Sequence, residues 1–300
     1  MSNLSPCGRF AFAAAPRALA RGATASISAA GVLLSGVMMP AAAAPGAAVE
    51  LQPHRIAYEI SLGPRKGGNS FASAQGLIAL EFTGNTCDGF ATNFRQATQL
   101  ADPDGETRNL DFRVTLWEEG QGQRFRFSVL NKINDETTRN ADGEAKRVKD
   151  GSVSVAMKRP EGKKGDFDGS ISFPSAMMIA LLDAALKGEK RFDARLFDGS
   201  EGGEKIFDTI ASIGPALDGE KNARLEPVMR SESLDKVPRW PISIAYYENT
   251  PGDRLPVYTM KSVTFANGVV SDLVFEFPEF SLAAKAVRYE ALPMEACKKK

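Results

Sequence analysis

The chain has 300 residues, and its 37 lysines and arginines are balanced by 37 aspartates and glutamates. This balance argues against nucleic-acid binding, which calls for a basic excess or a basic stripe. A single histidine leaves too few ligands for a histidine-based metal site, and no His-Glu-x-x-His pair is present. We therefore expect neither a metal nor another cofactor.

The first 48 residues differ in character from the rest. They contain no acidic residue, and three arginines, Arg9, Arg17 and Arg21, precede an apolar run that is followed by the alanine-rich residues 41–48. This order of basic, apolar and small segments is typical of a secretory signal peptide. We expect cleavage between residues 43 and 48.

An uncleaved membrane anchor is the alternative interpretation of this leader. Its apolar run is rich in Ala, Gly and Ser and is shorter than the roughly 20 strongly apolar residues that span a bilayer. No cysteine stands at the cleavage region, which disfavours a lipid anchor. The sequence thus predicts a leader over residues 1–48 and one exported domain over residues 49–300, located in the periplasm of a Gram-negative cell without a transmembrane anchor.

Removal of the leader discards Cys7 and leaves two cysteines, Cys87 and Cys297. Thiols oxidise in exported proteins, and two cysteines allow only one pairing. We expect a disulfide that ties the C-terminal tail to the first third of the chain. Two unrelated buried thiols are the alternative.

Apolar residues of the exported part recur mainly with a period of two, which indicates strands with alternating faces. The predicted runs are 56–62, 77–82, 90–100, 110–117, 125–130, 153–157, 192–197, 242–247, 257–265, 269–277 and 280–289. Dipeptides typical of turns, namely Asp104-Gly105, Asp142-Gly143, Asp150-Gly151, Asp168-Gly169, Asp198-Gly199 and Asn267-Gly268, lie among them. Neighbouring strands should therefore pair antiparallel as hairpins.

One segment has helical rather than strand periodicity. Between Pro174 and Leu186 the apolar residues Met177, Met178, Leu181 and Leu182 recur at helical spacing, and Gly188 ends the pattern. We expect a mainly β fold: one large, curved, antiparallel sheet of about a dozen or more strands, open and barrel-like, wrapped around this helix. These four helix residues either line a cavity for a hydrophobic ligand or form ordinary core.

The sequence offers little material for catalysis. A Ser-His-Asp triad would need His54, no Gly-x-Ser-x-Gly elbow is present, and His54 fits a hydrogen-bonded strand residue. The carboxylates Asp198, Glu201, Glu204 and Asp208 match no calcium loop, and glycines among them favour a hairpin turn. A hydrolase is therefore the least favoured function.

Several short motifs, in fixed order from about residue 52 to 297, carry a resemblance to a known family. They are Pro53-His54-Arg55-Ile56-Ala57-Tyr58, Cys87-Asp88-Gly89-Phe90, Phe125-Arg126-Phe127, Phe197-Asp198-Gly199-Ser200-Glu201, Phe207-Asp208-Thr209, Arg239-Trp240-Pro241-Ile242-Ser243 and Glu290-Ala291-Leu292-Pro293-Met294-Glu295-Ala296-Cys297. As a set they resemble the EipB family of periplasmic cell-envelope integrity proteins. The resemblance covers nearly the whole exported part.

The resemblance implies a β-spiral, similar in shape to the Lol lipoprotein carrier, with a bridge between Cys87 and Cys297. It also implies a non-enzymatic protein without catalytic residues that supports envelope integrity under stress, through a protein partner or an envelope component. A periplasmic tetratricopeptide-repeat protein is the partner that it suggests. A carrier of lipid or lipoprotein cargo is the alternative function.

Overall fold

The computed structural model describes residues 49–64, 70–217, 225–249, 252 and 254–297. The predicted signal peptide and its cleavage region lie outside these residues. No helix in the described ranges is both long enough and apolar enough to cross a membrane.

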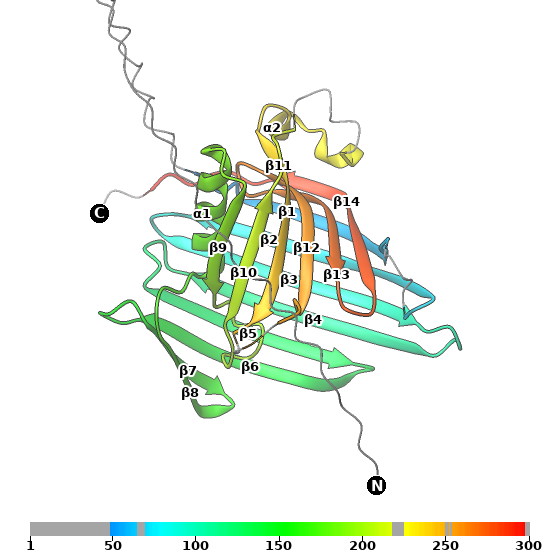
Figure 1. Cartoon of the computed structure of the whole chain (residues 1–300), viewed down its shortest axis with the longest axis horizontal. Coiled ribbons are helices and arrows are strands. Elements are labelled where there is room, and N and C mark those ends of the chain that lie inside the picture. Colours follow the sequence, from blue (N-terminus) through cyan, green and yellow to red (C-terminus); the bar gives the residue numbers. More distant parts are fainter. Residues whose placement is uncertain (1–48, 65–69, 218–224, 250–251, 253, 298–300) are drawn as a thin grey trace, which may run out of the picture. The chain divides into compact units, whose positions relative to one another are not determined.

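The described chain folds into one sheet of 14 strands in which every neighbouring pair is antiparallel (Figure 1). The strands are β1 (His54–Leu62), β2 (Ser73–Asn85), β3 (Gly89–Ala101), β4 (Thr107–Glu118), β5 (Arg124–Ile133), β6 (Glu136–Arg147), β7 (Val153–Arg159), β8 (Glu161–Phe167), β9 (Arg191–Leu196), β10 (Phe207–Ile213), β11 (Arg239–Glu248), β12 (Tyr258–Phe265), β13 (Val270–Glu276) and β14 (Ser281–Ala291). Their spatial order runs from β8 through β1 to β14 and then down to β9. The first strand therefore joins two halves of the sheet, β2–β8 and β9–β14.

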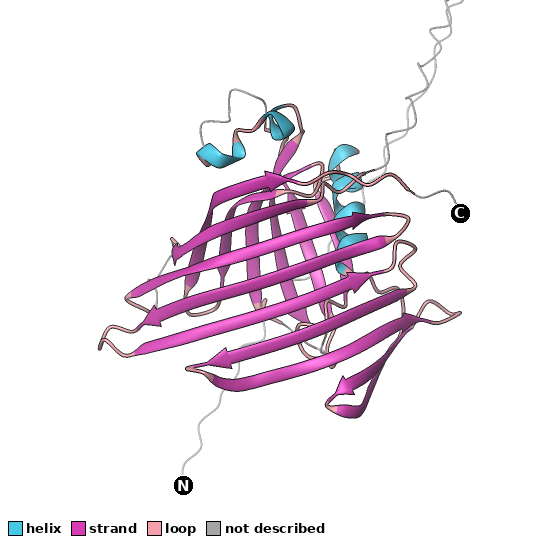
Figure 2. Cartoon of the chain, turned by 180° about the vertical axis from the view of Figure 1, so that it is seen from behind, coloured by secondary structure: helices cyan, strands magenta, loops and turns pink. Residues whose placement is uncertain are grey.

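The two halves face one another, because the sheet curls at β1 and β14. Figure 1 shows β9–β13 crossing in front of the long strands β2–β6, and Figure 2 shows the same crossing from behind. Alternate residues of β1 are buried between the halves, including Ile56, Tyr58 and Ile60. The predicted antiparallel curved sheet is confirmed.

Two predicted turns lie elsewhere than expected. Asp142-Gly143 stands inside β6, where the register shifts, and not at a hairpin end. A Cβ at Gly143 would lie 2.6 Å from Cζ of Phe127 and 2.8 Å from Sδ of Met157, so the glycine serves close packing. The β5–β6 turn is made instead by Asn134 and Asp135, both with positive φ.

Asp168-Gly169, the second misplaced turn, joins β8 to a helix rather than to a strand. Three strands, β6, β8 and β10, were absent from the predicted runs. The remaining turn dipeptides lie between antiparallel strands, as predicted.

Helix α1 spans Pro174–Leu186 as predicted, and Gly188 follows with a φ of 77°. The proline suits a first helical turn because its missing N–H would have no intrahelical partner there. Two shorter helical turns, η2 (Pro227–Met229) and α2 (Glu232–Asp235), were not predicted. Met229 and Leu234 of these turns are fully buried against the middle of the sheet, where β1 and β14 pair.

Buried apolar residues form three clusters in the described part of the chain. One lies between α1 and β9–β11, one lies where β1 and β14 meet the η2–α2 segment, and one is mainly aromatic. In the aromatic cluster the rings of Phe125 and Phe173 stack at 5.0 Å, and Phe197 meets Phe127 edge-on at 5.5 Å. Such packing fixes the segment before α1 against β5.

The sheet does not close by hydrogen bonds between its end strands, β8 and β9. The segment before α1 pairs with β9 through a parallel bridge between Ser172 and Leu196. The β9–β10 loop then packs on the inner face of the other half: Cβ atoms at Gly199 and Gly203 would lie 2.5 and 3.0 Å from the ring of Phe127. Loop packing thus takes the place of a closing strand pair.

Candidate ligand pocket

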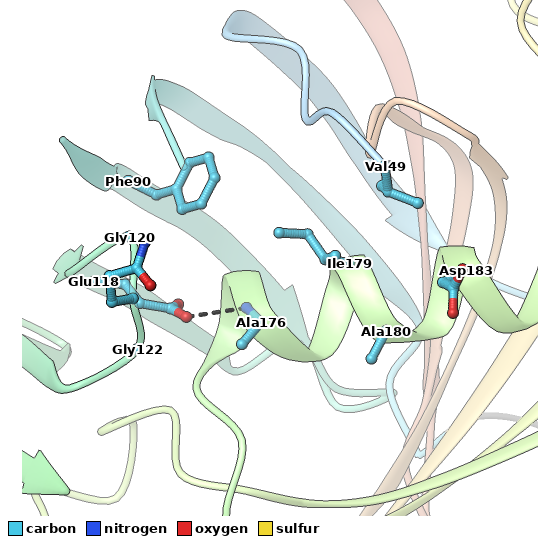
Figure 3. Close-up of a pocket in the computed structure, with 10 residues that line it drawn as sticks. Val49, Phe90, Glu118, Gly120, Gly122, Ala176, Ile179, Ala180 and Asp183 are labelled. Atoms are coloured by element: carbon cyan, nitrogen blue, oxygen red, sulfur yellow. Dashed lines mark hydrogen bonds between the residues drawn. The ribbon is translucent and has the colours of Figure 1, made fainter. Parts of the chain in front are cut away.

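Glu118, the last residue of β4, holds the beginning of α1. Its carboxylate accepts hydrogen bonds from the backbone N–H of Ser175, at 2.7 Å, and from that of Ala176, at 3.0 Å. Figure 3 shows the bond from Ala176. The helix has no capping side chain of its own, because Phe173 occupies the N-cap position. A distant carboxylate therefore satisfies N–H groups that the first turn of a helix leaves unpaired.

The surroundings of Glu118 are nearly closed to solvent, since the residue is 4% exposed. Burial raises the pKa of this carboxyl above its ordinary value, while the two helix N–H groups and the charge of Arg147 act in the opposite direction. Arg147 donates a 2.7 Å hydrogen bond to the carbonyl of Ile171 and lies 5.3 Å from the ring centre of Phe173. Both side chains therefore fix α1 to the sheet.

A pocket of about 440 Å³ opens between α1 and the adjoining ends of β3 and β4 (Figure 3). Its wall is mostly apolar, with Glu118 at one end and Asp183 at the other; the lining residues are Val49, Phe90, Glu118, Gly120, Gln121, Gly122, Ala176, Ile179, Ala180 and Asp183. A site of this kind accepts an apolar group and orients it with a few polar contacts.

The disulfide lies beside this pocket. Cys87 and Cys297 are bonded with their Cα atoms 5.6 Å apart, as expected from the sequence. The Cys87 turn packs tightly on the β4–β5 loop, because a Cβ at Gly120 would lie 2.0 Å from the carbonyl oxygen of Thr86. The bridge therefore supports one wall of the pocket.

The helix residues that the sequence put forward as a cavity lining occupy the opposite face of α1. Met177, Leu181 and Leu182 are buried in the cluster against β9–β11, and Met178 is partly buried there. None of the four borders the pocket, which meets the face that carries Ala176, Ile179, Ala180 and Asp183. The helical spacing of these pocket residues was visible in the sequence, but nothing marked the face as exposed to a hollow.

The family-motif residues are spread over the sheet and do not form a single site. Pro53, His54 and Arg55 lie at the start of β1, Asp88 and Gly89 at the β2–β3 turn, Phe197, Asp198 and Gly199 after β9, and Trp240 and Pro241 on β11. Gly89 has a φ of 100° and packs against the carbonyl of Glu118. Trp240 is buried beneath α1 in the same cluster as Leu181.

His54 is buried between the rings of Phe82 and Tyr289. Its Nδ1 lies 2.7 Å from the carbonyl oxygen of Gln52, and burial lowers the pKa of the imidazole. A neutral ring that donates to a backbone carbonyl accounts for these contacts. The arrangement fits the hydrogen-bonded strand residue expected from the sequence.

Three of the carboxylates after β9, Asp198, Glu201 and Asp208, have different partners. Asp198 accepts hydrogen bonds from N–H and Oγ of Ser200, and burial raises the pKa of its carboxyl. Glu201 pairs with Arg139, whereas Asp208 pairs with Arg254. In the described ranges no group of three or more His, Cys, Asp or Glu side chains is arranged to hold a metal ion.

The antiparallel, open sheet curled about α1, with an apolar pocket beside the helix, defines a β-barrel-like protein. Residues 45–293 match the model of the EipB-like family, so the chain belongs to that family. It is 30% identical over 252 residues to the cell envelope integrity protein EipB of Brucella abortus (strain 2308), covering 83% of this chain and 87% of the relative.

A solved structure shows the same fold. The crystal structure of a beta-barrel-like protein of a domain of unknown function, from Brucella abortus, superimposes with a TM-score of 0.73 at 28% identity. The match covers 82% of this chain and 100% of the other.

Proposed function

We propose that the protein is exported to the periplasm by a cleaved signal peptide and supports cell-envelope integrity there by binding, without catalysing a reaction. The name of the Brucella relative, cell envelope integrity protein, supports the envelope role. The basic, apolar and small segments of residues 1–48 support export, as does the Cys87–Cys297 bridge, because disulfides persist in oxidising compartments.

The observation that carries the binding role is the preformed pocket beside α1. Its helix wall is rigid, since Glu118 bonds the first turn and the opposite helix face is buried in the core. Rigid apolar walls lower the entropic cost of binding a ligand or a side chain of a partner. The arginine-free lining and the carboxylates Glu118 and Asp183 suit an apolar group that ends in a hydrogen-bond donor or a positive charge.

A substitution that fills the pocket tests this proposal. Ala180→Phe places a ring in the pocket beside α1, and Ala156→Phe makes the same change at an exposed position of β7. Both variants are expressed in a strain that lacks the gene and grown with a membrane-perturbing detergent. We expect Ala156→Phe to restore growth and Ala180→Phe to fail; equal growth at equal periplasmic amounts would refute the pocket role.

The partner that fits this role by family resemblance is a periplasmic tetratricopeptide-repeat protein. Purified repeat protein and the purified mature chain are mixed and analysed by sedimentation. A complex that forms with Ala156→Phe but not with Ala180→Phe would support the partner and locate its contact at the pocket. Free sedimentation of both proteins at micromolar concentration would exclude this partner.

A second candidate function, transport of lipid or lipoprotein cargo, is favoured by the inner face of the sheet. Several inward apolar side chains remain partly exposed between the buried clusters: Leu80, Phe82, Phe94, Phe112, Leu116 and Met260. A fully packed interior would bury such residues. Native mass spectrometry of protein isolated from the periplasm should then show a bound lipid mass, and its absence from every preparation would exclude this function.

A further inference from the structure

The outer face of the sheet carries a row of arginines interrupted by two alanines. Cross-strand pairing places Arg288, Ala57, Ala79, Arg95 and Arg113 side by side on β14, β1, β2, β3 and β4. Adjacent strands are about 4.8 Å apart, so the backbones at Arg288 and Arg95 are separated by roughly 14 Å. The short alanine side chains form a floor between longer arginines on both sides.

This row borders a surface hollow of about 550 Å³. Arg55, Arg95, Arg113 and Arg288 all line it, and the alanine floor lies between them. Asn93 and Thr115, in the adjacent cross-strand row, add neutral polar groups to the wall. The hollow lies on the face of the sheet opposite to the core and is separate from the pocket beside α1.

The pairing of Arg95 with Arg113 is unusual, because like charges directly opposite one another destabilise a sheet. Asp111 bridges the two residues: its Oδ1 accepts from Nε of each at 3.1 Å, and its Oδ2 accepts from both Nη2 atoms. The Nη1 groups of both arginines donate no hydrogen bond within the described part of the chain. One carboxylate therefore holds two guanidinium groups and leaves donors free.

The other side of the hollow also has spare donors. Arg55 bonds Glu81, while Glu290 lies 3.9 Å from Arg55 and 3.8 Å from Arg288, beyond a hydrogen bond. Arg288 is 76% exposed at its side chain and donates no hydrogen bond to any described residue. Four guanidinium groups thus face three carboxylates, Glu81, Asp111 and Glu290.

We propose that this hollow binds a phosphate group, carried by the headgroup of an anionic lipid. Guanidinium groups bind phosphate oxygens with two parallel hydrogen bonds, and arginines on both sides of a small floor can contact one phosphate together. The alanines leave the room that the phosphate requires. This inference does not depend on the pocket beside α1.

The test uses the purified mature chain with vesicles of phosphatidylglycerol or phosphatidylcholine, and separately with inorganic phosphate. Arg288→Gln removes guanidinium N–H donors from the hollow. Ala79→Leu fills the space above the two alanines without changing the charge. Arg191→Gln is the matched control, because Arg191 is an equally charged, 64% exposed residue on β9 that pairs with Asp193. Circular dichroism and thermal unfolding check that each variant is folded.

We expect the wild type and Arg191→Gln to bind phosphatidylglycerol vesicles equally. Arg288→Gln should bind about tenfold more weakly, which corresponds to the loss of one charged hydrogen bond. Ala79→Leu should bind about tenfold more weakly as well, because its side chain occupies the space of the phosphate. The same pattern with inorganic phosphate would show that phosphate alone suffices, and binding to vesicles alone would show that the headgroup must lie in a bilayer; either supports the proposal. Absence of wild-type binding to both probes would overturn it. So would an equal loss in Arg191→Gln, or wild-type affinity in Ala79→Leu.

Discussion

Glu118 caps helix α1 through the backbone N–H of Ser175, at 2.7 Å and 57 residues away in the chain. The loss of a helix-capping residue costs about 0.5–2 kcal/mol. We therefore expect Glu118→Ala to lower the thermal midpoint by several degrees, at roughly 2–4 °C for each kcal/mol in a domain of this size. Glu119→Ala is the control, because the side chain of Glu119 forms a 3.4 Å ion pair with Arg124 at the surface. Equal midpoints of the two variants would contradict the capping role.

The same carboxyl predicts a pH dependence of stability. Burial raises the pKa of Glu118 in the folded protein above its ordinary value of 4.5. At a pH between the pKa of the unfolded state and the higher pKa of the folded state, the folded state binds more protons than the unfolded state. The contribution of Glu118 to stability therefore falls as pH rises. The free energy of unfolding of the wild type minus that of Glu118→Gln should decrease as pH rises above 4.5 in urea titrations. A difference that is constant or increases with pH would be inconsistent with this account.

The disulfide should stabilise the protein without defining its fold. It closes a separation of 210 residues and holds a tail in which Leu292 donates to the carbonyl of Pro53. A native disulfide typically contributes about 2–4 kcal/mol. Reduction, or replacement of both Cys87 and Cys297 by Ser, should lower the thermal midpoint by several degrees while the β signal at room temperature persists. The Ser variant should no longer respond to reductant, and two free thiols in alkylated native protein would disprove the bridge.

Gly143 should be intolerant of even a methyl group. Its added Cβ would meet Phe127 and Met157 at less than 3 Å, so Gly143→Ala should cost roughly 1–3 kcal/mol through overpacking. Gly105→Ala, at a positive φ of 89° with open space around it, should cost only about 1–2 kcal/mol for backbone strain. The additional change Phe127→Leu should recover part of the loss in Gly143→Ala and none in Gly105→Ala. If the losses in the free energy of unfolding simply add in both double variants, the contact between Phe127 and position 143 does not cause the loss in Gly143→Ala.

His54→Ala should leave envelope function largely intact. The ring bonds one backbone carbonyl and packs on Phe82, so its removal should reduce stability and leave the proposed binding role intact. The measurement is complementation under detergent stress, together with the thermal midpoint. A variant that folds as well as the wild type but does not complement would reopen the possibility of a catalytic role.

The sequence predicted those strands whose buried face consists of large apolar residues. Strand β6 was missed because its buried positions are the small residues Ala141, Gly143 and Ala145; at Gly143 the side chains of Phe127 and Met157 leave no room for a Cβ. Strand β10 alternates Phe207, Thr209, Ala211 and Ile213, a pattern that the neighbouring carboxylates and glycines obscured.

The pocket was less accessible to prediction than the sheet. The spacing in Pro174–Leu186 predicted α1 and its apolar face, but the opposite face borders the pocket only because β3 begins and β4 ends beside it. The contact of Glu118 with Ser175 joins residues distant in sequence, and no local pattern encodes it. For the same reason the arginine row depends on the register of five strands, which the sequence alone did not determine.

The central claim, that the pocket beside α1 binds the ligand or partner of the protein, is tested most directly by crosslinking in living cells. Photoreactive leucine, which is too small to fill the pocket as a ring would, is placed at Ile179, inside the pocket, or at Ala156, exposed on β7. We predict a defined adduct from position 179 and none from position 156 during envelope stress. No adduct from position 179, or the same adduct from position 156, would contradict the account.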